Sequence, residues 1–345
     1  MVMEIRDIPE TTPIPGIIKI LGDGCNLIAN RIYLMAAPIL LDLFLLFGPK
    51  LRINEFFQPY MDAAFKQMIT TASAGRQQLE MSAELLMRTL GSVNLFGFLQ
   101  TFPIGIRTIS YGGTATPLGN SAEIQLKSLL QIIPLIMILI GTGILLGTLY
   151  YSIVSAACAK ENKNFTWKRF GTQLLNVILL YISIIILMVF LAIPFGCVMT
   201  LSFMISPVLY QIFFLILLVI SCWVIIPLFF IPQAIFMKDL DFPHAVKQSF
   251  TMSSWAGTLI IRYILLSLVL SFGLDMIWTI PDQSSWLILV SIFGHAFVSS
   301  AMLASSFILF RELDQWQTEN KRFLDWRKSN LRIKQLFKKE PETHE

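Results

Sequence analysis

The segment from Thr172 to Met237 contains no Lys, Arg, Asp or Glu over 66 consecutive residues. A membrane-spanning helix needs about 20 mostly apolar residues, because about 30 Å of hydrocarbon is crossed at about 1.5 Å per residue. The segment is too long for one span, and three spans would leave no room for turns. It therefore predicts two membrane-spanning helices joined by a tight turn near residues 202–206.

The composition of the whole chain indicates the same class of protein. Of its 345 residues, 55% are hydrophobic and 14% are charged, with a mean hydropathy of +0.68, whereas soluble domains carry about 25% charged residues. These values exclude a soluble enzyme, a nucleic-acid-binding protein and a disulfide scaffold, and the net charge of +4 identifies no partner. The four cysteines form no CxxC pair, so we predict neither a metal site nor a disulfide framework.

Further apolar segments complete the prediction of an all-α, polytopic membrane helical bundle with six transmembrane helices. We expect these helices at Asn30–Gly48, Ser128–Cys158, Thr172–Thr200, Pro207–Met237, Gly257–Ile280 and Ser285–Phe310. Residues 1–310 then form a six-span membrane domain, and residues 311–345 form a basic tail.

Lys and Arg residues set the expected orientation, because they accumulate in short cytoplasmic segments. With both termini inside, eighteen of them lie in the interior segments and none in the short exterior connections at residues 201–206 and 281–284. We therefore expect a multi-pass protein of the cell (cytoplasmic) membrane with both termini cytoplasmic. The acidic, proline-containing N-terminus is not typical of a signal peptide.

A short amphipathic segment precedes the first, third and fifth spans, at Pro15–Ile28, Asn164–Gly171 and Asp241–Ser254. Such segments predict helices that lie in the membrane interface. The pattern fits three repeated helix pairs, and it equally fits three unrelated linkers near a bilayer.

The exterior segment 49–127 is the one large aqueous segment, and it is amphipathic as well. Apolar residues recur at helical spacing before residue 72 and again after residue 78, which predicts two helices. The apolar stretch from Leu95 to Ile104 follows them. We interpret the whole segment as a lid that packs on the outer ends of the spans or enters the outer leaflet.

The sequence Ile231-Pro232-Gln233-Ala234-Ile235-Phe236-Met237, followed by Ala245, Lys247 and Ser249 and then by another span, resembles a known membrane domain. It is similar to the membrane domain of glycerophosphoryl diester phosphodiesterases and to related uncharacterised six-helix bacterial inner-membrane proteins. The resemblance implies a bacterial cytoplasmic-membrane protein. It does not imply phosphodiesterase activity, because that chemistry resides in a separate soluble barrel for which this chain has no room.

Ionisable residues inside a span are costly and indicate either function or a specific structural role. Asp42 and His295 lie near the middle of their spans, Asp275 lies near the exterior end of the fifth span, and Arg262 lies near its cytoplasmic end. We predict that Asp42, His295 and Asp275 form one intramembrane polar cluster. The cluster could relay protons or bind a cation, or it could be a buried hydrogen-bonded pair that holds helices together, which we favour.

Small residues and the tail supply two further predictions. Gly143 and Gly147 resemble a phosphate loop only superficially, and their spacing predicts close helix packing, as it does for Ala296, Ser300 and Ala304. From Trp326 to Lys339 the tail carries basic residues without an acidic one, and we expect these to contact anionic lipid head groups rather than nucleic acid. They are Arg327, Lys328, Arg332, Lys334, Lys338 and Lys339.

No residue set supports hydrolysis or group transfer, and no cofactor is expected. We predict a non-enzymatic integral membrane protein that handles or senses lipid or envelope components, or that acts as a scaffold for another membrane protein. The alternative is a transporter or permease subunit with a polar site at Asp42 and His295.

Overall fold

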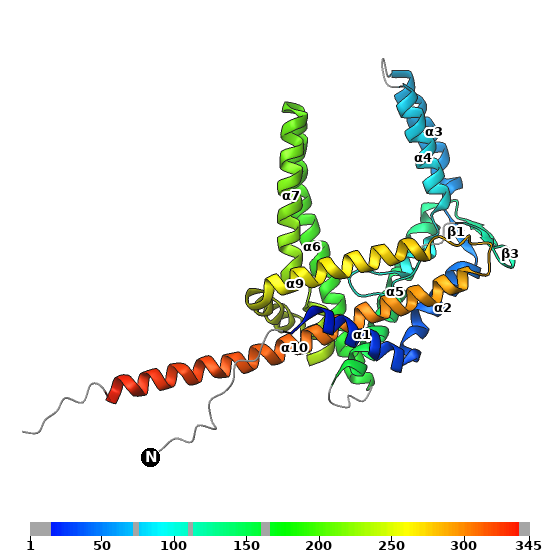
Figure 1. Ribbon diagram of the computed structural model, residues 1–345. Helices are drawn as coiled ribbons and strands as arrows, with labels where there is room; N and C mark the ends of the chain where they lie inside the picture. The colour runs from blue at the N-terminus through cyan, green and yellow to red at the C-terminus, as the bar shows by residue number, and fades with distance from the viewer. Residues whose placement is uncertain (1–14, 72–75, 110–112, 160–165, 338–345) are drawn as a thin grey trace, which may run out of the picture.

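The computed structural model describes residues 15–71, 76–109, 113–159 and 166–337, and these residues form an all-α protein (Figure 1). Five helices are long and apolar enough to cross a membrane, and a sixth span exists if α1 and the helix after it count as one broken span bent by 98°. The α-helices are α1 (Ile17–Asn30), α2 (Ala36–Phe47), α3 (Asn54–Thr71), α4 (Arg76–Ser92), α5 (Leu129–Cys158), α6 (Trp167–Ile205), α7 (Pro207–Leu228), α8 (Ile231–Lys238), α9 (Phe242–Trp278) and α10 (Ile288–Phe337).

Short elements complete the fold, and the sequence pattern does not predict them. Two 3-10 helices, η2 (Ile32–Met35) and η3 (Leu95–Leu99), precede α2 and follow α4. Strand β1 (Lys50–Arg52) pairs in parallel with β4 (Glu123–Gln125), and β2 (Ala115–Thr116) pairs antiparallel with β3 (Gly119–Asn120). The β1–β4 pair joins the two ends of segment 49–127.

Local sequence explains where several helices begin and end. Ser128 precedes α5 and its hydroxyl accepts a hydrogen bond from the Leu130 N–H, as expected for an N-cap residue. Ser206 does the same for α7, whose first residue is Pro207. The turn predicted near residues 202–206 therefore lies at Ser206, and α6 and α7 form a helical hairpin.

The first predicted amphipathic segment forms the separate helix α1, whereas the other two are continuous with the spans that follow them. Trp167–Gly171 form the first turns of α6, and residues 160–165 lie outside the described part of the chain. The predicted interfacial helix at Asp241–Ser254 and the fifth span are both within α9, with a kink at Ala256. Likewise, α10 runs continuously through residue 310, where the sequence predicts the end of the membrane domain.

Helix α10 is the central element of the body. It packs against α1, α9, α2, α5 and α8 (Figure 1). The α1–α10 contact is close because Gly24 has no side chain: a Cβ there would lie 2.7 Å from the Ala301 carbonyl oxygen and 2.8 Å from the Ser305 Cβ. The sequence predicts that α1 lies in the membrane interface, but its small and apolar side faces α10.

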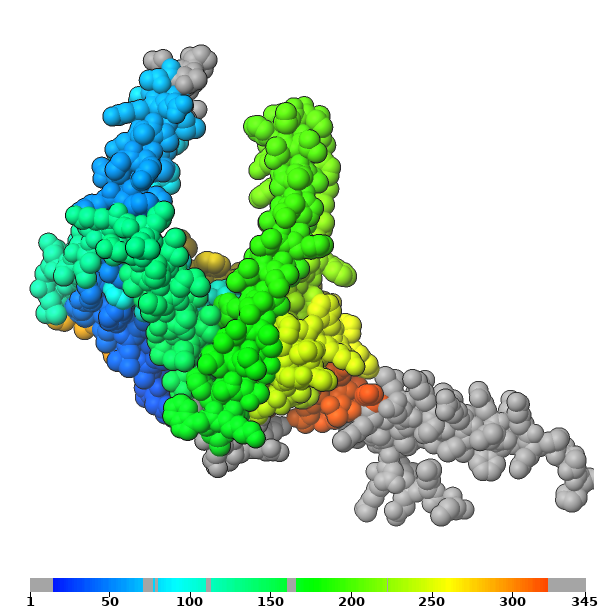
Figure 2. All heavy atoms as spheres, turned by 180° about the vertical axis from the view of Figure 1, so that it is seen from behind, coloured from blue at the N-terminus to red at the C-terminus, as the bar shows by residue number. Residues whose placement is uncertain are grey.

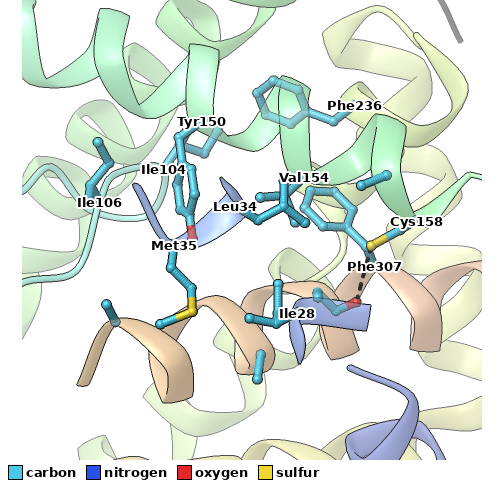
Figure 3. Packing of buried hydrophobic residues seen from close by; sticks show 14 of the residues in the cluster. Ile28, Leu34, Met35, Ile104, Ile106, Tyr150, Val154, Cys158, Phe236 and Phe307 are labelled. Carbon is cyan, nitrogen blue, oxygen red and sulfur yellow. Dashed lines mark hydrogen bonds between the residues drawn. The ribbon is translucent and has the colours of Figure 1, made fainter. Parts of the chain in front are cut away.

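The apolar core lies where α5, α8 and α10 meet α1 and η2 (Figure 3). Val154, Phe236 and Phe307 are completely buried there. The Sγ atom of Cys158 lies 3.7 Å from the Ala304 carbonyl oxygen, which joins the end of α5 to α10. Cys25, Cys158 and Cys197 are free thiols.

Two helical hairpins project from one side of this body, α3–α4 and α6–α7 (Figure 2). The α3–α4 hairpin contains the two helices that we predicted in segment 49–127. Its side chains are mostly exposed or half-buried, so these two helices do not cover the ends of the spans. For α3 and α4, the prediction that the segment packs on the outer ends of the spans is therefore wrong.

Residues 93–109, which we call the inserted segment, enter the body instead. Leu95 and Ile104 are almost completely buried, as are Ile106 and Ile109. η3 packs against α5 and β1. The apolar stretch from Leu95 to Ile104 thus belongs to the core, rather than to a layer above the spans.

Candidate functional site

The structure brings Asp42, His295 and Asp275 together in one polar cluster. The His295 Nδ1 atom lies 3.3 Å from the Asp42 Oδ2 atom, and its Nε2 atom lies 3.7 Å from the Asp275 Oδ1 atom. His295 on α10 thus lies between carboxylates from α2 and α9. The side chains of Asp42 and His295 are 0% and 4% exposed, while Asp275 is 32% exposed.

Both carboxylate oxygens of Asp42 have a partner within the protein. The Ile109 backbone N–H donates a 2.8 Å hydrogen bond to Oδ1, and His295 lies beside Oδ2. A buried carboxylate is stable only when such partners replace water. Asp42 therefore fixes the end of the inserted segment to α2 and α10.

The cluster reaches the surface through Asp275. Arg107 lies between the buried Ile106 and Ile109 of the inserted segment. Its side chain is 54% exposed, and its Nη2 atom lies 3.6 Å from the Asp275 Oδ2 atom. Four ionisable side chains thus form a continuous series from the buried Asp42 to the exposed Arg107. A series of this kind can keep opposite charges paired inside the protein, or it can pass a proton from one side chain to the next.

Sequence reasoning missed two tyrosines that hold the inserted segment. The Tyr181 hydroxyl on α6 donates a 2.6 Å hydrogen bond to the Ile104 carbonyl and accepts one from the Ile104 N–H at 3.2 Å. The Tyr151 hydroxyl on α5 donates to the Pro103 carbonyl at 3.1 Å. The available signal was the hydroxyl itself, because a tyrosine inside an apolar span needs a partner for its polar end.

Gly143 and Gly147 permit close packing, but their partner is the inserted segment and not another long helix. A Cβ on Gly143 would lie 2.6 Å from the Leu99 carbonyl oxygen, and one on Gly147 would lie 2.8 Å from the Gly105 Cα. Both glycines therefore admit the backbone of the inserted segment against α5. Gly141 has no atom within 4 Å of such a Cβ.

The predicted small-residue face of α10 has separate partners. The Tyr150 hydroxyl donates a 2.8 Å hydrogen bond to the Ser300 Oγ. Ala296 and Ala304 are both completely buried. This face packs against α5, which agrees with the prediction of close helix contacts.

The basic residues of the tail lie mainly on the last part of α10. Arg327, Lys328, Arg332 and Lys334 belong to its helical backbone, while Lys338 and Lys339 lie outside the described residues. At about 1.5 Å per residue, Arg327 lies about 25 Å along the helix from Phe310. Arg262, a basic residue that the sequence places in a span, lies on α9 and is exposed.

Residues 231–237, which carry the resemblance to the phosphodiesterase membrane domain, form most of α8. Ile231, Ile235 and Phe236 are buried in the core. The Ser249 Oγ donates a 2.6 Å hydrogen bond to the Pro227 carbonyl and accepts one from the Phe230 N–H. These residues hold the chain where α7 ends and α9 begins, so their role here is packing.

Comparison with known proteins gives no relative: no family model, curated protein or solved structure matches this chain. Among the described residues, no group of three or more His, Cys, Asp and Glu side chains is arranged to hold a metal ion. The geometry of the cluster and of the surfaces around it therefore carries the functional interpretation.

Proposed function

We propose that this chain is a non-enzymatic integral membrane protein that handles or senses lipid. It crosses the cytoplasmic membrane six times, in three helix pairs, with both termini on the cytoplasmic side. The observation that carries the proposal is the apolar surface of the α6–α7 hairpin.

The projecting part of α6 and α7 presents large apolar side chains to its surroundings without any charged residue. Phe190, Met204 and Trp223 are 71%, 77% and 76% exposed. In the most apolar 18-residue window of the α7–α8 region, no residue is buried. Exposing apolar area to water costs about 25 cal/mol per Å², so this hairpin requires a hydrocarbon environment.

The polar cluster supports a structural role rather than transport. Asp42 and His295 are closed off from the surface, and the inserted segment satisfies one oxygen of Asp42 with its own N–H group. A transport site must exchange a substrate or ion with water, whereas this arrangement fixes backbone to side chain.

A transporter or permease subunit is the second candidate, and one observation favours it. The ionisable series Asp42–His295–Asp275–Arg107 extends from the core to the surface. Replacing Asp42 by Asn separates the two functions, because the amide keeps the acceptor for Ile109 but cannot carry a proton. Unchanged solute or proton flux in vesicles excludes transport through this series, and loss of flux with unchanged stability excludes the structural role.

The direct test is to extract the protein in a mild detergent and to identify the lipids and proteins that remain bound. Retention of a defined lipid supports lipid handling. Retention of a stoichiometric membrane protein without lipid would instead support a scaffold. Reporter fusions at residues 75, 162 and 345 test the topology: residue 75 should be outside and the other two inside, and an exterior C-terminus would contradict six spans.

The tail adds an electrostatic contact with anionic lipid to this proposal. Each basic residue beside a membrane contributes about 1 kcal/mol, but only within about one Debye length, ~8 Å at physiological salt. A straight α10 along the membrane normal would carry Arg327 too far from the surface, so contact requires α10 to tilt or bend. A peptide covering residues 316–339 should bind vesicles containing phosphatidylglycerol and lose binding as salt rises. Equal binding to neutral vesicles would contradict the electrostatic contact.

A further inference from the structure

A pocket of ≈ 300 Å³ lies where α6 begins and α8 ends, remote in sequence from the polar cluster. Its lining includes Thr166, Lys168, Arg169, Gln173 and Asp239. This volume is at the lower end of the range of ligand pockets, about 300–1,000 Å³. Most of its lining residues have polar side chains, although the pocket adjoins the most apolar hairpin of the protein.

An ion pair forms one wall of the pocket. The Arg169 Nε donates a 2.7 Å hydrogen bond to the Asp239 Oδ1, and its Nη2 donates to the Phe236 carbonyl at 3.2 Å. Asp239 can occupy this turn because it has a left-handed backbone conformation, with φ of 54°, which Asp tolerates better than most residues. The pair joins α6 to the end of α8.

Gln173 supplies a buried acceptor without a partner. Its side chain is 2% exposed, and its Nε2 donates a 2.8 Å hydrogen bond to the Asp239 Oδ1. Its Oε1 atom has no hydrogen-bond partner among the described residues. Asn176, one turn further along α6, differs because its Oδ1 accepts the Phe242 N–H at 3.0 Å. An unpaired buried acceptor is costly, so the pocket lacks one donor group.

The charges of the pocket indicate what the missing ligand carries. Among the described lining residues, Lys168, Arg169 and Asp239 are the charged ones, and together they carry a net charge of +1. A ligand with one negative charge would neutralise the charge of Lys168. A hydroxyl group on the same ligand would donate a hydrogen bond to the unpaired Gln173 Oε1. Arg169 uses only two of its five N–H groups in the contacts described, which leaves donors for an anion.

The position of the pocket along α6 indicates a lipid. Trp167 is 78% exposed at the start of the helix, where aromatic residues typically mark the membrane interface. Gln173 is the second residue of the long uncharged segment that begins at Thr172. Leu175 is 59% exposed and Leu179 is 40% exposed, so an apolar surface for acyl chains begins beside the pocket.

We propose that this pocket binds the phosphodiester headgroup of an anionic glycerol-type phospholipid, with the phosphate at Lys168 and Arg169 and a headgroup hydroxyl donating to the Gln173 Oε1. The proposal deepens the lipid-handling function and rests on it. It names the class of lipid and the residues that select it.

The test compares two lipids of equal charge on the delipidated full-length protein. Phosphatidylglycerol carries headgroup hydroxyls, whereas phosphatidylmethanol has the same phosphodiester charge and none. Native mass spectrometry of the protein with each lipid should show about tenfold tighter retention of phosphatidylglycerol, which corresponds to one hydrogen bond of about 1.4 kcal/mol. Replacement of Gln173 by Met should abolish this preference while retention of phosphatidylmethanol stays unchanged.

Two lysine variants, one in the pocket and one outside it, separate binding in the pocket from general attraction to the protein surface. Lys168→Gln should weaken retention of both lipids about fivefold, as expected for a basic residue worth about 1 kcal/mol at a membrane surface. Lys247→Gln removes an exposed lysine from the amphipathic part of α9, outside the pocket, and should leave retention unchanged. Equal effects of the two variants would indicate general surface attraction and overturn the proposal.

The remaining outcomes separate this proposal from the proposed function. If both lipids are retained equally and Gln173→Met changes nothing, the pocket assignment is wrong although lipid binding stands. If none of the lipids is retained, the proposed function itself fails. If millimolar inorganic phosphate displaces phosphatidylglycerol from the pocket, the site recognises a soluble phosphate instead of a lipid, and the proposal is overturned.

Discussion

The polar cluster at Asp42 and the pocket at Gln173 differ in whether their buried polar atoms have hydrogen-bond partners within the protein. In the cluster, backbone and side-chain donors satisfy both oxygens of the buried carboxylate. In the pocket, a buried amide oxygen has no partner among the described residues. A buried polar residue therefore indicates function only when the protein itself leaves one of its polar atoms without a hydrogen-bond partner.

The strongest test of the closed cluster is the removal of its carboxylate. Asp42→Leu should lower the free energy of unfolding by about 3–5 kcal/mol, because it leaves His295 and the Ile109 N–H without their partner. His295→Leu added to it should restore stability only in part, since the Ile109 N–H stays unpaired. Thermal unfolding in detergent measures both, and Asp62→Leu on the exposed face of α3 is the control. A stable Asp42→Leu variant would contradict the structural role.

The end of the helix that carries Asp42 should respond to pH. The Lys50 ammonium donates to the carbonyls of Leu45 and Leu46 at the end of α2, and burial lowers the pKa of Lys50 from 10.5 to about 8. Between these values the unfolded chain binds more protons than the folded one, so stability should rise with pH from about 8 to 10.5, by up to about 3 kcal/mol.

The variant Lys50→Met serves as the reference for that pH dependence, since it retains the side-chain length but cannot titrate. The difference in unfolding free energy between wild type and Lys50→Met should change in this pH range and stay constant below pH 7. A constant difference at every pH would show that Lys50 keeps its ordinary pKa.

The inserted segment can be tested with two glycines of the same helix. Gly147→Ala should cost about 1–3 kcal/mol of stability, because its Cβ meets the backbone of Gly105 and Ile104 and nothing flexible can move away. Gly141→Ala has open space and should be neutral or stabilising by up to about 1 kcal/mol. Equal unfolding temperatures for the two variants would mean that the segment does not pack against α5.

The smallest expected effect concerns a single hydroxyl. Tyr181→Phe removes both hydrogen bonds to Ile104 and should lower the free energy of unfolding by about 1–1.5 kcal/mol. Tyr33→Phe, at a tyrosine that is 63% exposed, should have no measurable effect. Chemical denaturation of the purified protein resolves this difference, and matching midpoints would remove Tyr181 from the contacts that hold the inserted segment.

The sequence by itself determined the helices and the class of protein. Long uncharged segments leave a chain few alternatives to a membrane helix, because backbone polar groups in hydrocarbon must bond within the helix. Depth along the spans was also enough to group Asp42 with His295, since isolated charges at that depth are too costly. Each of these properties depends on residues close together in the chain.

Only the tertiary structure decided what fills the space between the helices. Nothing in the local pattern shows that residues 93–109 enter the body, that α1 packs along α10, or that Gly143 and Gly147 face the inserted segment. The acceptor of Gln173 could not be recognised either, because it lies on an apolar helix and its neighbour Asp239 is 66 residues away. These features depend on which distant backbones approach each other, and packing, unlike helix formation, is not encoded within a few residues.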